Sequence, residues 1–253
     1  MKEIASICDR HNIPYYLVGG SMIGAIRHQG FIPWDDDIDM AIPRPYYGKF
    51  LDVVNKELSS FYNAKSSENS SEYVYSFIKV EDIRTEIEFP WTKGCGLHES
   101  LCVDVFVFDG TPQNRFLRSI YCYYIQRLIA IKGALYLNEN MRTPIKRMVS
   151  KLLKKIVSFK KQTVISFIDN QMQRYEFSKS DYVVNYNGVY GKREIIHKKI
   201  LGSPTNYIFE DTQFSGVENY HEFLTSIYGD YMVLPPKEKQ TNHSLTVTFK
   251  MLI

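Results

Sequence analysis

The residues best suited to chemistry form an acidic cluster near the N-terminus. Aspartate occupies four of five consecutive positions, at Asp35, Asp36, Asp37 and Asp39, and the glycine pair Gly19–Gly20 precedes them. Clustered carboxylates bind hard divalent cations, and a glycine turn that opens a helix binds phosphate through backbone amides. The combination indicates metal-assisted transfer of a phosphoryl or nucleotidyl group.

Apolar residues that alternate through this cluster predict a β-strand over Trp34–Ile42. Because alternate side chains of a strand share a face, Asp35, Asp37 and Asp39 should point to one side and Asp36 to the other. Three aligned carboxylates can share one metal site. A solvated acidic turn is the alternative, and the apolar alternation favours the strand.

A fifth aspartate interrupts the apolar run Leu101–Phe108, which reads as a central strand. Asp104 is a candidate further metal ligand if this strand lies beside the first, since a lone buried carboxylate is otherwise costly. A structural carboxylate is the equal alternative. The sparse ligand set suits Mg²⁺, which keeps several waters, better than Ca²⁺. Mn²⁺ is the alternative ion.

The glycine pair ends an extended segment and begins a short helix over Ser21–His28, with Ser21 as the predicted N-cap. The amides of Gly20 and Ser21 would then hold a donor phosphate. A plain turn is the alternative, because the residues match neither the Rossmann fingerprint nor the P-loop. Three basic side chains are candidate phosphate partners: Arg27, His28 and Lys79. For His28 and Lys79, taken alone, a surface or structural role is the favoured interpretation.

The remaining pattern predicts a mixed α/β (α+β) fold. Helices are expected over 1–12, 46–58 and 218–227, and extended segments over 15–18, 73–80 and 85–89. From Arg115 onward the pattern becomes mainly helical. We therefore expect a catalytic core over residues 1–114 and a helical region over 115–253, packed together as one unit.

The composition excludes several classes. The 253 residues carry 31 basic and 28 acidic side chains, a net charge of +3, so no nucleic-acid partner is expected. The 4 cysteines form no CxxC pair and should be reduced thiols. No run reaches the roughly 20 apolar residues of a membrane span. These features predict a cytoplasmic protein.

One helix combines apolar and basic faces. Between residues 145 and 157 apolar side chains recur every three or four positions while lysine and arginine fill the other face, and no acidic residue occurs from 140 to 168. The simpler interpretation is a core-packed helix with a solvated basic face. The alternative is peripheral contact with a membrane surface or another polyanion.

Four segments resemble the LicD family, which contains bacterial phosphocholine transferases and is related to the fukutin-type ribitol-phosphate transferases. The long segment Gly19–Asp39 is similar to the family signature. Phe77–Asp82 and Val103–Gly110 look like the two strands that follow it, and Tyr228–Pro236, with His243 beyond, looks like the C-terminal signature. The resemblance covers both ends of the chain and leaves residues 115–199 weakly constrained.

The resemblance implies a nucleotidyltransferase-like fold in which a mixed sheet is flanked by helices. It also implies Mg²⁺-dependent transfer of a phosphorylated alcohol, such as phosphocholine, from a CDP-activated donor to a hydroxyl of a cell-surface glycan or its lipid-linked precursor. Carried over by position, Asp37 and Asp39 would be paired metal ligands and Asp104 the third acidic residue. Gly20 and Ser21 would cradle the donor phosphates.

Two other functions remain open at this point. A nucleotidyltransferase would keep the fold but move a nucleoside monophosphate from an NTP to a small molecule or RNA, releasing pyrophosphate. A non-catalytic nucleotide- or glycan-binding protein would bind without turnover. Because the metal carboxylates are all present, the sequence favours an enzyme.

Overall fold

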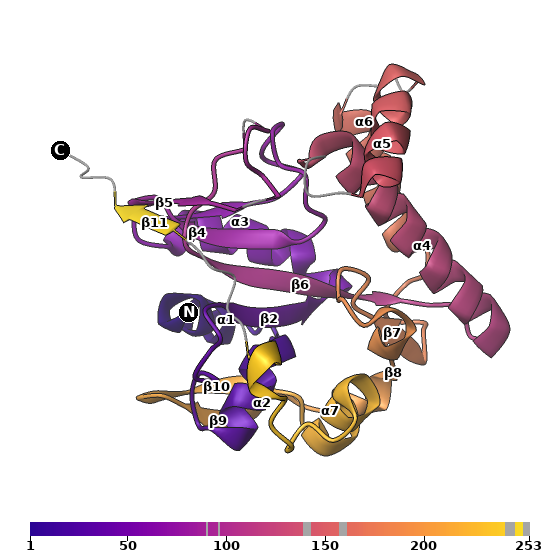
Figure 1. Cartoon of the computed structure of the whole chain (residues 1–253). Coiled ribbons are helices and arrows are strands. Elements are labelled where there is room, and N and C mark those ends of the chain that lie inside the picture. The colour runs from indigo at the N-terminus through magenta and orange to yellow at the C-terminus, as the bar shows by residue number, and fades with distance from the viewer. Residues whose placement is uncertain (90, 96, 139–142, 157–160, 241–245, 250–253) are drawn as a thin grey trace.

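The computed structural model describes residues 1–89, 91–95, 97–138, 143–156, 161–240 and 246–249. Its centre is a mixed sheet with the strand order β3-β4-β6-β2-β1-β10-β9 (Figure 1). The strands of this path are β1 (Tyr16–Leu17), β2 (Ile38–Pro43), β3 (Tyr62–Lys65), β4 (Ile78–Asp82), β6 (Cys102–Gly110), β9 (Thr205–Phe209) and β10 (Thr212–Gly216). Strands β7 (Tyr182–Val184) and β8 (Ile195–His197) extend the sheet from the end of β6, and β5 (Thr85–Glu88) pairs separately with β11 (Thr246–Phe249). This architecture confirms the α/β class with a mixed sheet.

The middle of the sheet is formed by β2 and β6, which run parallel to each other. Strand β1 lies antiparallel to β2 and parallel to β10. The inner positions of these strands carry fully buried apolar side chains such as Ile42, Val105 and Leu17. Strands from both ends of the sequence therefore share one core, and the sheet crosses the expected division at residue 114.

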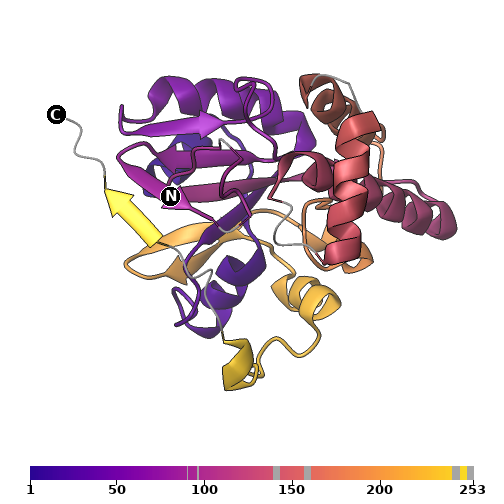
Figure 2. The same cartoon turned by 45° about the horizontal axis from the view of Figure 1, so that its top comes forward.

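Helices cover the sheet and extend beyond it. They are α1 (Lys2–Arg10), α2 (Gly19–Arg27), α3 (Tyr47–Glu57), α4 (Arg115–Tyr136), α5 (Pro144–Ile156), α6 (Lys161–Met172) and α7 (Tyr220–Tyr228). Figures 1 and 2 show α4, α5 and α6 gathered to one side of the sheet, while α2 and α7 lie near each other below it. No helix in the described ranges is long and apolar enough to cross a bilayer.

The strand expected over Trp34–Ile42 is shorter in the structure, because β2 begins only at Ile38. A turn at Pro33–Trp34 precedes it, and Asp35–Asp37 follow that turn without strand structure. The pairing of β2 with β6 begins at Ile38 and Val103, and the Asp35 amide donates a hydrogen bond to the Ile32 carbonyl at 2.8 Å within the turn. The alternation argument thus applies to Asp39 and not to Asp35 or Asp37.

Helix α2 also begins earlier than expected. It starts at Gly19, with Val18 as the N-cap residue, so the prediction that Ser21 caps the helix is wrong. Ser21 lies inside the first turn and is buried, and its hydroxyl oxygen accepts a hydrogen bond from the Asp39 amide at 2.9 Å. The side chain that seemed to stabilise a helix end instead ties that helix to β2.

The core-packed interpretation of the basic helix is wrong for the side chains that can be described. Ile145 and Met148 of α5 are 73% and 67% exposed, and Val149 and Leu152 are exposed as well. Helix α5 contacts α4 through Ser150, which is fully buried and donates a hydrogen bond to the Ala134 carbonyl. Apolar periodicity predicted the helix correctly but could not show which elements cover it.

Candidate functional site

A cavity of about 600 Å³ opens beside the central strands. One wall comes from the N-terminal segments that carry the acidic cluster, namely the start of α2, the turn before β2, and β2 and β6 themselves. The other wall comes from the loop after β7, from α7 and from the residues that follow α7. The two walls of the cavity therefore come from segments near opposite ends of the sequence, which the shared sheet brings together.

The glycine pair sits where carboxylates approach the backbone closely. Gly19 has a φ of +58°, and a Cβ there would lie 2.5 Å from Oδ2 of Asp39. A Cβ on Gly20 would lie 2.2 Å from Oδ2 of Asp35. The positive φ of Gly19 favours glycine, and at either position a side chain would displace the neighbouring carboxylate. The aspartates consequently pack against the positive N-terminal end of α2, which favours negative charge.

Asp39 and Asp104 occupy paired register positions on the neighbouring parallel strands β2 and β6. Both line the cavity, together with Asp35 and Asp37. Burial raises the pKa of Asp39 well above its ordinary value, and the negative charges of Asp37, Asp104 and Asp35 raise it further. Burial also raises the pKa of Asp104. The positive charge around these carboxylates is therefore too small to balance their negative charge. A bound cation would supply the missing positive charge.

Asp36 does not line this cavity, as the sequence predicted, although the reason differs. The irregular segment before β2, rather than strand alternation, turns it away. The conclusion about which aspartates meet holds, while the alternation that led to it covers only Asp39.

Lys79 lies in β4 at the register position next to Asp104. Its buried ammonium group donates to Oε2 of Glu99 at 2.8 Å and lies 3.9 Å from Oδ1 of Asp104. The rings of Tyr75 and Phe89 lie 4.7 and 5.1 Å from its Nζ atom. Lys79 does not line this cavity, but it lines a smaller cavity of about 90 Å³ together with Asp37 and Asp104.

The other predicted phosphate partners are placed differently from one another. Gly20 and Arg27 line the cavity, whereas Ser21 and His28 do not. Arg27 donates a hydrogen bond to the Tyr231 carbonyl at 2.6 Å, which fixes its guanidinium at the cavity wall. Burial and the charge of Arg27 lower the pKa of His28. The structure thus brings Gly20, Arg27 and the aspartates together and leaves Ser21, His28 and Lys79 outside.

Sequence reasoning missed part of the opposite wall, namely Asn185, Asn187, Tyr190 and Glu194. Tyr228 and Tyr231, which also line this wall, belong to the segment that resembles the C-terminal signature. The sequence around the missed residues shows polar and glycine positions typical of a loop. Nothing in their spacing links them to the aspartates, which lie roughly 150 residues earlier in the chain. Only the pairing of β7 with the end of β6 brings this loop to the cavity.

The residues fit a divalent cation in part. Within the described ranges, no three His, Cys, Asp or Glu side chains are placed so that they could hold a metal ion together. Asp39 and Asp104 nevertheless offer a facing pair of carboxylates with raised pKa values. Mg²⁺ commonly uses one or two protein carboxylates and completes its shell with water and substrate phosphate. The donor set therefore fits Mg²⁺ better than an ion that needs a closed protein cage.

The mixed sheet and an acidic cavity beside the N-terminus of a glycine-led helix define a class of group-transferring enzyme. A family model described as "LicD/FKTN/FKRP, nucleotidyltransferase domain" matches residues 12–126. The chain is also 32% identical over 244 residues, 95% of its length and 90% of the relative's, to the lipopolysaccharide cholinephosphotransferase LicD of Haemophilus influenzae. The chain belongs to the LicD family and is a transferase of that family.

Two weaker similarities complete the comparison. A segment of 41 residues, 16% of this chain and 8% of the other, is 41% identical to the human ribitol 5-phosphate transferase FKRP. Among solved structures, ANT(2″)-Ia in complex with adenylyl-2″-tobramycin aligns with a TM-score of 0.25 at 16% identity, over 67% of this chain and 95% of that one. At that score the structural alignment carries no argument about this protein.

Proposed function

We propose that the protein transfers a phosphorylated alcohol from a CDP-activated donor to a hydroxyl group of a glycan. The observation that carries this proposal is the facing pair Asp39 and Asp104 in a cavity that also presents Gly20 and Arg27. Membership of the LicD family supports the same chemistry, since its relatives are named for cholinephosphate and ribitol 5-phosphate transfer.

The reaction is a displacement at phosphorus. The acceptor oxygen forms a bond to the phosphorus that bears the alcohol, the bond from that phosphorus to the bridging oxygen breaks, and CMP leaves with the electron pair. The acceptor proton passes to a base, and Asp104 is the candidate because it lines the cavity beside Asp39 and burial raises its pKa. Asp104 serving only as a metal ligand is the alternative role.

The residues around the acidic cluster have separate roles in this reaction. Asp39 and Asp104 would hold Mg²⁺, and Asp37 lines the same cavity, as the sequence predicted for all three. The bound ion would neutralise the phosphate oxygens. The amide end of α2 at Gly20 and the guanidinium of Arg27 would orient the diphosphate. Lys79 would keep Asp104 in position through its 3.9 Å approach.

The products of the reaction test this proposal. The protein is incubated with Mg²⁺, a glycan acceptor and CDP-choline, CDP-ribitol or CDP-glycerol, and nucleotide release is measured. We expect CMP and no pyrophosphate. Pyrophosphate release from an NTP would instead establish a nucleotidyltransferase, and donor binding without any turnover would establish a binding protein. Chelation of divalent ions should abolish CMP release, and added Mg²⁺ or Mn²⁺ should restore it.

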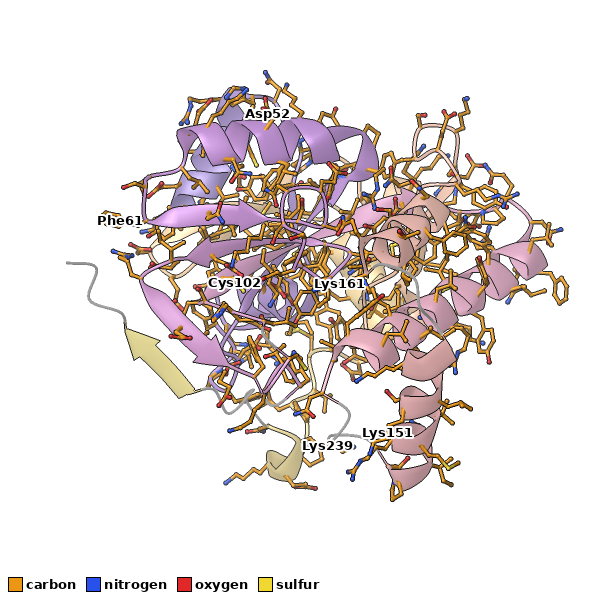
Figure 3. All side chains as sticks on the ribbon, turned by 90° about the horizontal axis from the view of Figure 1, so that it is seen from above. Asp52, Phe61, Cys102, Lys151, Lys161 and Lys239 are labelled. Carbon is orange, nitrogen blue, oxygen red and sulfur yellow. The ribbon has the colours of Figure 1, made fainter. Side chains whose placement is uncertain are left out.

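We further propose that α5 brings the enzyme to the surface of an anionic membrane, where a lipid-linked acceptor would be found. Its apolar side chains Ile145, Met148 and Leu152 are exposed, and basic side chains flank them. Lys151 is one of these exposed residues, and Figure 3 labels it on α5. A helix with exposed apolar and basic groups binds an anionic interface, at about 1 kcal/mol for each basic residue near the surface.

Vesicle sedimentation tests this contact. The protein should sediment with phosphatidylglycerol vesicles and much less with phosphatidylcholine vesicles. Met148→Glu with Leu152→Glu should abolish sedimentation, while Ile208→Glu, at an exposed position of β9, should not. Equal sedimentation of the α5 variant and the control variant would refute the contact and leave the transfer chemistry untouched.

A further inference from the structure

A buried carboxylate in the second wall of the cavity has no cationic partner. Three glutamates are buried in the described ranges, at Glu81, Glu99 and Glu194. Glu81 pairs with Lys65 and Glu99 with Lys79, at 2.5 and 2.8 Å. Glu194 is 9% exposed, and within the described part of the chain no basic group lies at ion-pair distance from it. A buried charge without a partner is unfavourable, so a function for Glu194 must be sought in the cavity it lines.

The backbone around Glu194 is built to hold this carboxylate in place. Its Oε1 atom accepts a hydrogen bond from the Tyr190 amide at 3.3 Å. A Cβ on Gly188 would lie 2.2 Å from Cδ of Glu194, so only glycine leaves room for the carboxylate there. Arg193 donates to the Ile227 carbonyl at 3.5 Å and so links this loop to α7.

Two tyrosines flank the same region. The rings of Tyr190 and Tyr228 are edge to face, with centroids 4.8 Å apart, and both rings line the cavity with Glu194. Burial raises the pKa of Tyr228, and the negative charges of Glu194, Asp39 and Asp35 raise it further. Tyr228 thus shares one cavity with the carboxylates of both walls.

The cavity as a whole favours a positively charged occupant. Its lining carries six carboxylates, Asp35, Asp37, Asp39, Asp104, Glu194 and Asp230, against a single guanidinium, that of Arg27. One divalent ion at the aspartates would neutralise only part of this charge. Aromatic faces beside a carboxylate are a favourable site for an ammonium group, and most of all for a quaternary one, which attracts ring faces without needing hydrogen bonds.

We propose that Glu194, together with Tyr190 and Tyr228, binds the positively charged head of the alcohol that is transferred, and so selects ammonium alcohols over neutral polyols. This inference rests on the proposed function, in which the cavity holds an alcohol linked to CDP. The aspartate wall then receives the diphosphate, and the Glu194 wall receives the far end of the same donor.

A pair of donors that differ only in charge tests the inference. CDP-choline is compared with CDP-3,3-dimethylbutanol, in which carbon replaces the quaternary nitrogen, so shape is kept and charge is lost. The wild-type protein should use CDP-choline with a kcat/KM about 10-fold to 100-fold higher. Glu194→Gln keeps the size of the side chain and an acceptor for the Tyr190 amide, and it should remove this preference. Tyr190→Leu should reduce it.

The control is Glu222→Gln, which removes one negative charge from an exposed position of α7 and should preserve the preference. Equal use of the two donors by the wild-type protein would overturn the inference. So would an equal fall in kcat for both donors with Glu194→Gln and an altered pH profile, since that result would make Glu194 a base. A rise confined to the acceptor KM would also overturn it, because Glu194 would then face the glycan.

Failure of the proposed function gives a different result. If CDP-ribitol is turned over and CDP-choline is not, transfer chemistry stands and the inference falls. If no donor is turned over, the proposed function fails, and calorimetry with the same two donors decides the inference alone. Tighter binding of CDP-choline that Glu194→Gln abolishes would uphold it, and equal affinity would overturn it.

Discussion

Strand β6 carries two aspartates, five residues apart, whose surroundings differ. Asp109 is 2% exposed, and its two oxygens accept hydrogen bonds from the Arg44 guanidinium at 2.6 and 2.8 Å. Asp104 faces other carboxylates, and Lys79, the nearest cation, lies closer to Glu99 than to Asp104. An odd separation places the two side chains on opposite faces of the strand.

This difference assigns Asp109 a structural role and Asp104 a functional one, although both belong to β6. Burial alone would lower the pKa of Arg44, but the charge and hydrogen bonds of Asp109 outweigh burial and leave that pKa raised. Burial raises the pKa of Asp109 too, although the charge and hydrogen bonds of Arg44 oppose that rise. The two hydrogen bonds to Arg44, rather than the pKa of Asp109, show that this pair is complete in the folded chain. Asp104 and Asp39 have raised pKa values because burial and like charges disfavour ionisation. A carboxylate whose compensation is missing from the chain marks the place where a ligand must supply it.

The largest effect should follow from changes on the cavity side of this comparison. Asp39→Asn or Asp104→Asn should lower kcat by at least roughly 100-fold to 1,000-fold, because each removes a charge directed at the reacting phosphate. Thermal stability should be kept or increased, since a repulsive buried charge is lost. CMP release and a thermal melt measure the two outcomes.

Asp36→Asn is the matched control for this change, because Asp36 belongs to the same cluster and does not line the cavity. It should retain activity close to that of the wild-type protein. A loss of stability in the Asp39 or Asp104 variants that matched their loss of activity would contradict the distinction between the two aspartates of β6.

The opposite pattern is expected for Asp109→Asn. Removing one partner of a buried ion pair leaves Arg44 uncompensated and should cost about 3–5 kcal/mol in the free energy of unfolding. The folded fraction should keep its kcat. Urea unfolding measures the first quantity, and activity per folded molecule measures the second. The double variant Asp109→Leu with Arg44→Met should recover much of the stability, because it removes both charges; failure to recover any would count against the pairing.

Glu194 extends the comparison to the pH dependence of the protein's stability. Burial raises its pKa to about 7, above the ordinary value of 4.5. The folded protein therefore holds a proton that the unfolded chain releases between these values, so stability should fall as pH rises from about 4.5 to 7. The contribution of Glu194 should amount to roughly 1–3 kcal/mol, and the fall should be smaller by that amount in Glu194→Gln, which leaves the raised pKa values of Asp39 and Asp104 in place.

Urea unfolding at pH 5 and pH 8, without ligand, measures this pH dependence. Glu222→Gln should leave the wild-type dependence in place. If the wild-type protein and Glu194→Gln lost stability equally between the two pH values, Glu194 would not be the uncompensated group that its surroundings indicate.

The same contrast explains how far the sequence could lead. The continuous apolar run Leu101–Phe108 predicted β6 as a central strand, and Asp104 was expected beside the acidic cluster on the condition that the two strands are neighbours. The register of Asp39 with Asp104 follows from strand pairing and confirms that the two strands are neighbours. Local patterns were sufficient wherever the partner was an adjacent, regular strand.

Tertiary pairing decided the rest. Asp35 and Asp37 reach the cavity from the irregular segment before β2, whose course the alternation of apolar residues did not predict. The wall around Glu194 depends on a loop that β7 attaches to the far end of β6, a contact between distant parts of the sequence. For α5, periodicity showed an apolar face but not whether protein, solvent or lipid covers it. A single sequence gives no signal for contacts of this kind.

The smallest effect should come from the hydrogen bond that holds Asp39 in its position. The buried Ser21 hydroxyl accepts from the Asp39 amide at 2.9 Å. Ser21→Ala leaves that amide without this acceptor and should cost about 1–2 kcal/mol in stability. It should also lower kcat by less than about tenfold, because Asp39 keeps its charge and loses only part of its alignment. Ser226→Ala removes a comparable hydroxyl from α7, where it donates to the Phe223 carbonyl, and should leave kcat unchanged. If Ser21→Ala lost stability but kept full activity, the bond would hold the sheet to α2 without positioning the carboxylate. The reacting geometry would then depend on the β2–β6 register alone.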